Sequence, residues 1–186
     1  MEIPDNLKHY SELLLEYNKN INLVSRKIST EDLAQLLNET LLIDPYISHS
    51  FIVDAGSGNG LMGIPIALAN PNRQVTLVEP KQKKFQFLIH AKEKLNLTNI
   101  DVRGISIEEY LKGLKKIDHR SITVISRGFP QLEVFCRFLQ KRLIGEAIII
   151  TSENKIKKNQ KPLESMRKKI YNVPLRENLK ILKITS

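Results

Sequence analysis

The sequence predicts a doubly wound α/β domain with a mainly parallel sheet. Short apolar segments alternate with amphipathic ones between residues 51 and 151, and parallel strands need helical crossovers between them. A turn rich in glycine directly follows the first of these apolar segments. The chain has 186 residues, 41% of them hydrophobic, which is enough to build the single core of one domain.

Two amphipathic helices are expected before the first strand. From Asp5 to Ser25 apolar residues recur at helical spacing. The second helix is expected from Glu31 to Ile43, with Thr30 as its N-cap and Pro45 ending it. We therefore expect one domain over residues 1–186, with a helical extension at 1–45 and an α/β core at 50–186.

Strands and helices then take turns along the chain. Strands are expected at 51–53, 75–78, 100–102, 122–125 and 147–151. Helices are expected at 61–69, 81–95, 106–111 and 131–143. Pro80 is expected to start the helix 81–95, because its φ is already helical. The lysine-rich segment 152–161 has no apolar periodicity and is expected to be a mobile loop.

The end of the chain predicts a hairpin. Segments 165–173 and 178–185 are plausible strands joined through Pro174, Leu175 and Arg176. Strands joined in this way run antiparallel, so we expect them to give the parallel sheet an antiparallel edge.

Composition narrows the class of partner. Lys and Arg outnumber Asp and Glu by 29 to 20, a formal net charge of +9, which favours phosphate-bearing partners, although a soluble protein from a lysine-rich proteome fits equally well. Cys136 is the only cysteine, so an intrachain disulfide and a two-cysteine metal site are excluded, and no metal is expected. The N-terminus does not look like a signal peptide, and no apolar run is long enough to span a bilayer, so we expect a cytoplasmic protein without a membrane partner.

The glycine turn suggests a nucleotide-like cofactor. Gly56, Gly58 and Gly60 allow a tight turn and close approach of a ligand. Gly58, Gly60 and Gly63 also spell G-x-G-x-x-G, so a nicotinamide dinucleotide competes as the ligand. Asp54 at the strand end would repel a pyrophosphate and suit the cationic S-adenosylmethionine, either contacting it through water or bracing the loop.

Acidic residues also follow the next two strands. Glu79 ends the second strand and is expected to accept hydrogen bonds from both ribose hydroxyls of a cofactor, with a helix-capping role as the alternative. After the third strand, an adenine is expected to lie against Ile107, with the backbone or Glu108 at its amino edge. The alternative is a simple capping pair of Ser106 and Glu109.

In combination, several segments resemble the bacterial 16S ribosomal RNA guanine-N7 methyltransferase family, also called glucose-inhibited division protein B. These segments are Tyr17 to Leu23, Asp54 to Pro65, Leu77 to Leu88, Ile105 to Tyr110 and Ile125 to Arg127. The resemblance covers most of the chain. It implies a Rossmann-like methyltransferase fold, S-adenosylmethionine as cofactor and a guanine of 16S rRNA as substrate. In the second helix the family has a histidine followed by Asp-Ser-Leu, where this chain has Asn38 through Leu42.

The resemblance also assigns site residues. It implies that Gly56 and Leu61 contact the cofactor, that Ile107 and Glu108 frame its adenine, and that Glu79 and Arg127 lie in the cofactor site. With Asp54 and Gly58 from the glycine turn, these complete the expected cofactor-binding set.

No catalytic base is expected, because guanine N7 attacks an activated methyl group with a free lone pair. Arg127 is then a positioning residue, directed at the cofactor carboxylate or an RNA phosphate, with a surface ion pair as the alternative. Arg127→Ala is expected to lose methylation while folding normally. Phe129 is expected either to stack on the guanine or to pack in the core.

The expected partner is 16S rRNA or the small ribosomal subunit, bound by a monomer. Candidate contacts are basic side chains, although such charge runs are more often solvated surface. These side chains are Lys19, Arg26, Lys27, Lys155, Lys157 and Lys158. Two other functions remain open at this point. One is a nicotinamide-dependent reductase, and the other is a non-catalytic RNA-binding or ribosome-assembly protein on the same fold.

Overall fold

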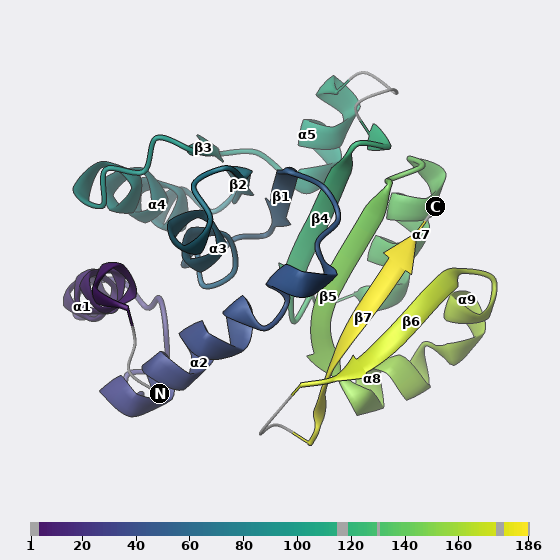
Figure 1. The fold of residues 1–186 in the computed structure, drawn as a ribbon, viewed down its shortest axis with the longest axis horizontal. Helices are drawn as coiled ribbons and strands as arrows, with labels where there is room; N and C mark the ends of the chain where they lie inside the picture. The colour runs from purple at the N-terminus through teal and green to yellow at the C-terminus, as the bar shows by residue number, and fades with distance from the viewer. Residues whose placement is uncertain (1–3, 115–118, 130, 174–176, 186) are drawn as a thin grey trace.

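A computed structural model describes residues 4–114, 119–129, 131–173 and 177–185. Within them, seven strands form one sheet with the order β3-β2-β1-β4-β5-β7-β6 (Figure 1). The strands are β1 (Phe51–Ala55), β2 (Gln74–Val78), β3 (Ile100–Arg103), β4 (Ile122–Arg127), β5 (Glu146–Ser152), β6 (Arg167–Asn172) and β7 (Leu179–Thr185). β1 to β5 pair in parallel, whereas β7 runs antiparallel to both β5 and β6. The predicted doubly wound sheet with an antiparallel edge is confirmed.

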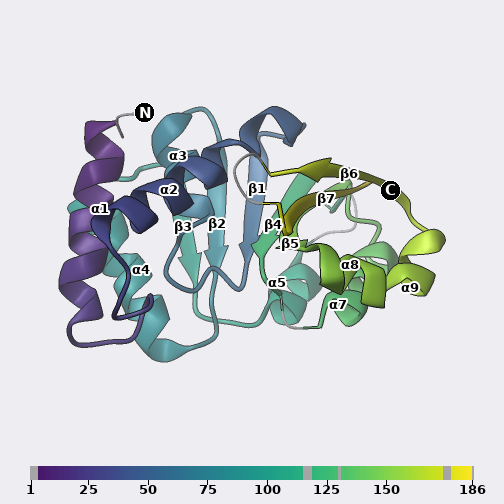
Figure 2. The same cartoon turned by 90° about the horizontal axis from the view of Figure 1, so that it is seen from below.

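Helices cover both faces of this sheet (Figure 2). They are α1 (Asp5–Asn18), α2 (Thr30–Leu41), the 3-10 helix η1 (Asp44–Tyr46), α3 (Gly63–Ala69), α4 (Gln82–Lys94), α5 (Ile107–Gly113), α7 (Leu132–Lys141), α8 (Glu153–Lys158) and α9 (Gln160–Glu164). One buried apolar cluster joins α1, α2, α3 and α4 to one face of the sheet. A second cluster joins α5, α7, α8 and α9 to the other face.

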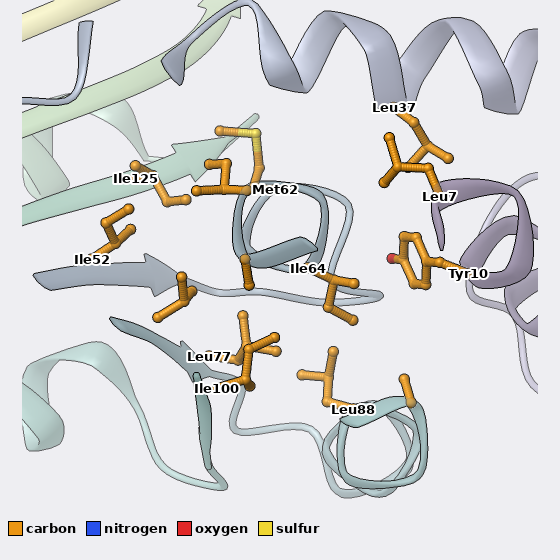
Figure 3. Packing of buried hydrophobic residues seen from close by; sticks show 14 of the residues in the cluster. Leu7, Tyr10, Leu37, Ile52, Met62, Ile64, Leu77, Leu88, Ile100 and Ile125 are labelled. Carbon is orange, nitrogen blue, oxygen red and sulfur yellow. The ribbon is translucent and has the colours of Figure 1, made fainter. Parts of the chain in front are cut away.

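The N-terminal helices share the core of the sheet. Leu7 and Tyr10 of α1 and Leu37 of α2 are fully buried in the same cluster as Ile52 and Leu77 of the strands. Figure 3 shows these side chains around α3, with the α1 and α2 residues on one side of that helix and the strand residues on the other. Because burying a large apolar side chain stabilises the fold by roughly 1.5–3 kcal/mol, α1 and α2 are tied firmly to the sheet.

The first helix is shorter than the sequence predicts, because it ends at Asn18 and not at Ser25. The buried side-chain oxygen of Asn18 accepts hydrogen bonds from the backbone N–H groups of Leu23 (2.8 Å) and Val24 (3.0 Å). Asparagine competes for backbone partners in this way and favours turns over helix interiors. The chain therefore leaves α1 in a fixed turn, although the apolar periodicity continues.

Two helix starts also differ from prediction. The N-cap of α2 is Ser29, whose hydroxyl accepts from the Asp32 N–H at 3.0 Å, and Thr30 is the first helical residue. The helix α4 begins at Gln82, with Lys81 at its N-cap. Pro80 therefore precedes α4 and does not start it.

Two helices, α8 and α9, occupy most of the segment 152–161, so the prediction of a mobile loop is wrong. Ser152 caps α8 by accepting from the Lys155 N–H at 3.2 Å. Ile156 of α8 and Leu163 of α9 are buried against the second cluster. With only two apolar anchors seven positions apart in a lysine-rich stretch, the periodicity was too sparse to predict these helices.

The sheet brings the site residues to one edge. In parallel pairing, Ala55 of β1 lies beside Val78 of β2, and Asp54 lies beside Ile125 of β4. The residues that follow these strands, including the glycine turn and Glu79, therefore meet at the carboxyl ends of the strands. This is the edge at which parallel α/β sheets bind ligands.

Candidate functional site

The glycine turn adopts a backbone that only glycine tolerates easily. Gly56, Gly58 and Gly60 have φ values of +68°, +61° and +83°, in the left-handed region where a Cβ is costly. At Gly60 a Cβ would also lie 2.5 Å from Cδ1 of Ile64. The predicted use of these glycines in a tight turn is confirmed.

Backbone donors of this turn point back into the protein. The N–H groups of Gly56 and Ser57 both donate to the Val78 carbonyl, at 2.9 and 3.0 Å. The N–H of Gly60 donates to the Ser57 carbonyl at 2.8 Å. A helix or loop that binds phosphate presents free N–H groups to it, and these three are already engaged.

The Glu79 carboxylate accepts a hydrogen bond from another backbone N–H of the turn. Its Oε2 accepts from the Gly58 N–H at 2.8 Å, and its Oε1 accepts from the Lys81 N–H at 2.9 Å. The side chain is buried at 5% exposure. Each carboxylate oxygen has a second lone pair, so Glu79 can brace the turn and still accept a hydroxyl from a ligand at the same edge.

Asp54 braces the turn from beneath. Its side chain is buried, and its Oδ2 accepts from the Gly63 N–H at 3.0 Å. Burial raises the pKa of Asp54 to about 7, against the stabilising effect of the Gly63 hydrogen bond. At neutral pH the group is therefore only partly ionised, and electrostatic repulsion by Asp54 is a weaker argument against a diphosphate than the sequence suggests.

The N-terminal segment holds the turn from the opposite side. The buried Tyr10 hydroxyl donates to the Asn59 carbonyl at 2.6 Å. Thr40 of α2 donates to the Leu61 carbonyl at 2.8 Å. The Asn59 side-chain amide in turn donates to the Leu23 carbonyl at 2.9 Å. Donors that precede the sheet in the chain thus fix the carbonyls of the glycine turn.

Arg127, the last residue of β4, forms a buried ion pair. Its Nη2 lies 2.8 Å from Oε2 of Glu39 on α2, and the two side chains are 21% and 4% exposed. Nη1 of Arg127 is buried and has no hydrogen-bond acceptor among the described residues. An ion pair is therefore present, as the alternative predicted, but Glu39 is buried and Arg127 largely so, and the pair does not exclude a positioning role for Arg127.

The adenine candidates differ in exposure. Ile107 is the first residue of α5 and is buried in the second cluster, whereas Glu108 is exposed. The Ser106 hydroxyl accepts from the Glu109 N–H at 3.1 Å, so the capping interaction is present. This cap does not exclude a ligand against Ile107, but it accounts for Ser106 without one.

Phe129 packs against the core. Its ring stacks on Phe135 with centroids 4.0 Å apart and an interplanar angle of 11°. The core-packing alternative is therefore confirmed. The same ring lies 4.0 Å from the position that a Cβ on Gly56 would take, so Phe129 also forms a wall beside the glycine turn.

The predicted RNA-contacting residues fall into two groups. Lys19, Arg26 and Lys27 are exposed in and around the segment that connects α1 to α2. Lys155, however, donates to the Phe129 carbonyl at 3.2 Å, and Lys157 pairs with Glu153 at 2.8 Å. Lys158 is exposed. Lys155 and Lys157 therefore have structural partners that the loop interpretation did not anticipate.

Sequence reasoning missed the residues that support the turn. Tyr10 lies in the expected N-terminal helix, where the apolar spacing gives no separate signal for its hydroxyl. Glu39 and Thr40 lie in the stretch that departs from the family pattern. Of these residues, only Asn59 lies within the glycine turn predicted from the sequence. Its polar side chain between two glycines is the one local sign of a structural role.

No group of three or more His, Cys, Asp or Glu side chains that would hold a metal ion occurs in the parts of the chain that the structure covers. Over the same residues, none of the helices has the length and apolarity needed to cross a membrane.

Solved structures of methyltransferases share this fold. An O-methyltransferase from Bacillus cereus in complex with SAH matches with a TM-score of 0.67 at 15% identity, over 100% of this chain and 93% of that one. A precorrin-6y C5,15-methyltransferase from Geobacter metallireducens matches with a TM-score of 0.60 at 16% identity, over 88% of this chain and 90% of that one. The chain therefore has the Rossmann-like fold of the S-adenosylmethionine-dependent methyltransferases.

Comparison with related sequences narrows the class of protein from a shared fold to one family. Residues 3–179 match the family model described as rRNA small subunit methyltransferase G. A ribosomal RNA small subunit methyltransferase G from Brachyspira hyodysenteriae is 31% identical over 93% of this chain and 83% of its own length. The protein of the same name from Nitrosomonas europaea is 41% identical over 69% of this chain, and the match spans 58% of that relative. The chain belongs to the rRNA small subunit methyltransferase G family, which confirms the resemblance.

The buried carboxyl of Asp54 predicts a pH-dependent stability. The pKa of Asp54 is about 7 in the folded protein and 3.8 in the unfolded chain, so protonation of Asp54 favours the folded state. This contribution to the free energy of unfolding is complete below about pH 4 and is lost as the pH rises towards 7. Asp54→Asn removes this titration. Relative to the wild type, the variant should gain about 2–3 kcal/mol in free energy of unfolding between pH 5 and pH 8.

Urea unfolding of both proteins across this range measures the difference. Asp101→Asn, at an exposed side chain, is the matched control and should follow the wild type. Parallel stability curves for wild type and Asp54→Asn would show that Asp54 keeps an ordinary pKa.

The buried Arg127–Glu39 pair changes the expected behaviour of Arg127→Ala. Removing one partner of a buried ion pair costs about 3–5 kcal/mol, because the remaining charge loses its compensation. Arg127→Ala should therefore destabilise the fold by about 3 kcal/mol, contrary to the sequence-based expectation of normal folding. The double variant Glu39→Gln/Arg127→Ala should recover part of this loss.

A double-mutant cycle by urea denaturation separates the coupling from the individual changes. The exposed pair Arg137 and Glu133, 2.9 Å apart, provides the matched cycle and should show little coupling. Additive effects at Arg127 and Glu39 would mean that the ion pair contributes nothing to stability.

Proposed function

We propose that this protein transfers a methyl group from S-adenosylmethionine to N7 of a guanine in the 16S rRNA of the small ribosomal subunit. The observation that carries the proposal is the glycine turn at the carboxyl edge, in a chain that belongs to the rRNA small subunit methyltransferase G family. The Bacillus cereus neighbour on the same fold is in complex with SAH, which supports the same cofactor class here.

The turn suits a methyl donor better than a dinucleotide. A diphosphate needs free backbone N–H groups, but those of Gly56, Gly58 and Gly60 already donate within the protein. The phosphates of a dinucleotide would also lie beside the buried carboxylate of Glu79, and the like charges would repel each other. S-adenosylmethionine carries no phosphate, and its cationic groups match an acidic edge. These contacts disfavour the reductase alternative.

Glu79 and Phe129 give the edge its shape for the cofactor. Glu79 is held by two backbone donors, so its remaining lone pairs are fixed in direction and can accept ribose hydroxyls. Gly56 is exposed next to the Phe129 ring, and the missing Cβ leaves room for a ligand to approach the backbone. In this proposal Leu61, Ile107 and Glu108 complete the cofactor contacts predicted from the sequence.

The reaction requires positioning more than acid–base chemistry. When bound, S-adenosylmethionine would supply a methyl group activated by its sulfonium. The N7 lone pair would form a bond to the methyl carbon in line as the C–S bond breaks, so that S-adenosylhomocysteine leaves and no proton has to be lost first. The chain then has to align the two reactants. We assign this role to Arg127, whose Nη1 lacks an acceptor among the described residues and can donate to a carboxylate or phosphate oxygen. Glu39 fixes the guanidinium through Nη2.

Two of the four histidines are held away from the carboxyl edge of the sheet. His119 is buried, and its ring nitrogens lie 3.0 and 2.9 Å from the carbonyls of Arg142 and Leu111. His49 lies 3.1 Å from the Thr123 hydroxyl, near the amino end of β4. Neither ring is placed at the carboxyl edge of the sheet.

The remaining organisation follows from the same proposal. We expect one functional unit over 1–186, because α1 and α2 share a buried cluster with the sheet. A monomer in the cytoplasm is the expected form for an enzyme that acts on ribosomal subunits, with Lys19, Arg26 and Lys27 among its RNA contacts and Lys158 on the opposite flank.

A labelling assay tests this proposal. Small subunits that lack the modification are incubated with the protein and methyl-labelled S-adenosylmethionine, and nuclease digests are analysed by mass spectrometry. We expect the label in N7-methylguanine at a single position of 16S rRNA. Subunits that already carry the modification are the control and should take up no label.

Two outcomes would contradict the proposal. Tight binding to subunits with no label transferred would favour a non-catalytic assembly protein. Label in a base other than guanine would retain the enzyme class and overturn the assigned acceptor.

A further inference from the structure

A groove separates α1 from α4 beside the proposed cofactor edge. It has a volume of about 670 Å³, and Figures 1 and 2 both place the two helices side by side at one end of the molecule. The side chains that line it come from the end of α1, the residues just after it and one face of α4. None of them belongs to the cofactor-binding set described above.

The turn after α1 creates this groove. Because Asn18 binds the N–H groups of Leu23 and Val24, the chain folds back at the end of α1. Asn20 and Ile21 then line the groove and do not continue the helix. These residues belong to the Tyr17 to Leu23 segment that carried the family resemblance, in which the proposed function gives a role only to Lys19.

Aromatic rings form one part of the groove. The ring of Tyr17 packs against Phe87, with centroids 5.4 Å apart, and against His90, with centroids 4.7 Å apart at an angle of 38°. Tyr17 and His90 are both partly exposed. Partly exposed rings supported from below provide faces on which an unpaired base can stack.

Exposed polar side chains line another part of the groove. Asn20, Gln82, Lys83 and Gln86 are exposed and line the groove. Over the described residues their side chains make no hydrogen bond or ion pair. Amides both donate and accept, which suits the edges of unpaired bases, and a lysine suits a phosphate.

Charge favours RNA over a protein partner at the start of α4. Helix N-termini favour acidic residues, yet the first turn of α4 contains none, and Lys81, Lys83 and Lys84 gather there instead. Glu93 lines the groove too, but it lies ten residues further along α4, about 15 Å away by helix rise.

This end of the groove meets the glycine turn. Nζ of Lys84 lies 3.7 Å from the position that a Cβ on Gly58 would take, and Lys81 donates its N–H to Glu79. A strand of RNA whose target base entered the cofactor edge would therefore continue over the first turn of α4.

We propose that the groove between α1 and α4 binds a single-stranded segment of ribosomal RNA adjacent to the methylated nucleotide. Tyr17 and His90 stack with a base, Asn20, Gln82 and Gln86 contact base edges, and Lys83 binds a phosphate. This proposal rests on the proposed function, because it places the RNA relative to the methyl-transfer site.

Charge reversal at Lys83 tests the groove. Binding of the full-length Lys83→Glu protein to unmodified 16S rRNA is measured at several salt concentrations, beside Lys94→Glu. Lys94 is exposed on the same helix at its other end, so the charge change is matched. We expect about tenfold weaker binding for Lys83→Glu, and a salt-dependence slope smaller by about 0.7, the value for one lost phosphate contact on a single strand.

For Lys94→Glu we expect less than a twofold change and the wild-type slope. Affinity for S-adenosylhomocysteine, measured by calorimetry, should be the same in all three proteins, which shows that the cofactor edge is intact. Gln86→Ala should weaken RNA binding about threefold without changing the slope, because an amide contact releases no counterion.

Several results would overturn the inference. One is an equal effect of Lys83→Glu and Lys94→Glu on RNA binding. Another is a loss of cofactor affinity in Lys83→Glu. A third is that Lys83→Glu binds intact subunits more weakly but binds protein-free 16S rRNA as the wild type does. The last result would assign the groove to a ribosomal protein. If the wild type binds RNA through the groove but transfers no methyl group, the proposed function is wrong, whereas the proposal that the groove binds RNA still holds.

Discussion

The structure depends on the hydrogen bonds that the backbone of the glycine turn makes with the rest of the protein. Its N–H groups donate inward, to the Val78 and Ser57 carbonyls and to Glu79, and Asp54 accepts from the Gly63 N–H at the start of α3. A buried amide left without a partner costs about 1–3 kcal/mol, so these contacts fix the path of the turn. They also decide its chemistry, because a turn with engaged donors offers little to a phosphate and leaves a carboxylate at the edge.

The same constraint explains why two helices precede the sheet. The turn leaves carbonyls on its outer side, to which Tyr10 of α1 and Thr40 of α2 donate. The Asn59 side-chain amide donates to the Leu23 carbonyl in the segment between these helices. The Glu39–Arg127 ion pair ties α2 to the end of β4 in the same region. Residues ahead of the sheet are therefore part of the site, and the first helix also provides one wall of the groove beside it.

Local pattern was enough to predict the fold and the glycine turn. Alternating apolar segments gave the sheet, and the positive φ values at Gly56, Gly58 and Gly60 follow from residue type. Contacts between distant segments were out of reach, because nothing near Tyr10 in the sequence indicates a bond to Asn59, 49 residues away. Asp54 shows the difference most clearly: its position was predicted, but its burial and its pKa of about 7 depend on packing that a sequence does not display.

Ligand discrimination by the wild-type chain tests the engaged turn most directly. Calorimetric titrations with S-adenosylhomocysteine, NAD and NADP at equal concentrations measure it. With the N–H groups of the turn committed to Val78 and Glu79, S-adenosylhomocysteine should bind with a measurable heat and a stoichiometry of about one, while neither dinucleotide binds. Saturable binding of NAD or NADP without binding of S-adenosylhomocysteine would contradict the assignment of this edge to a methyl donor.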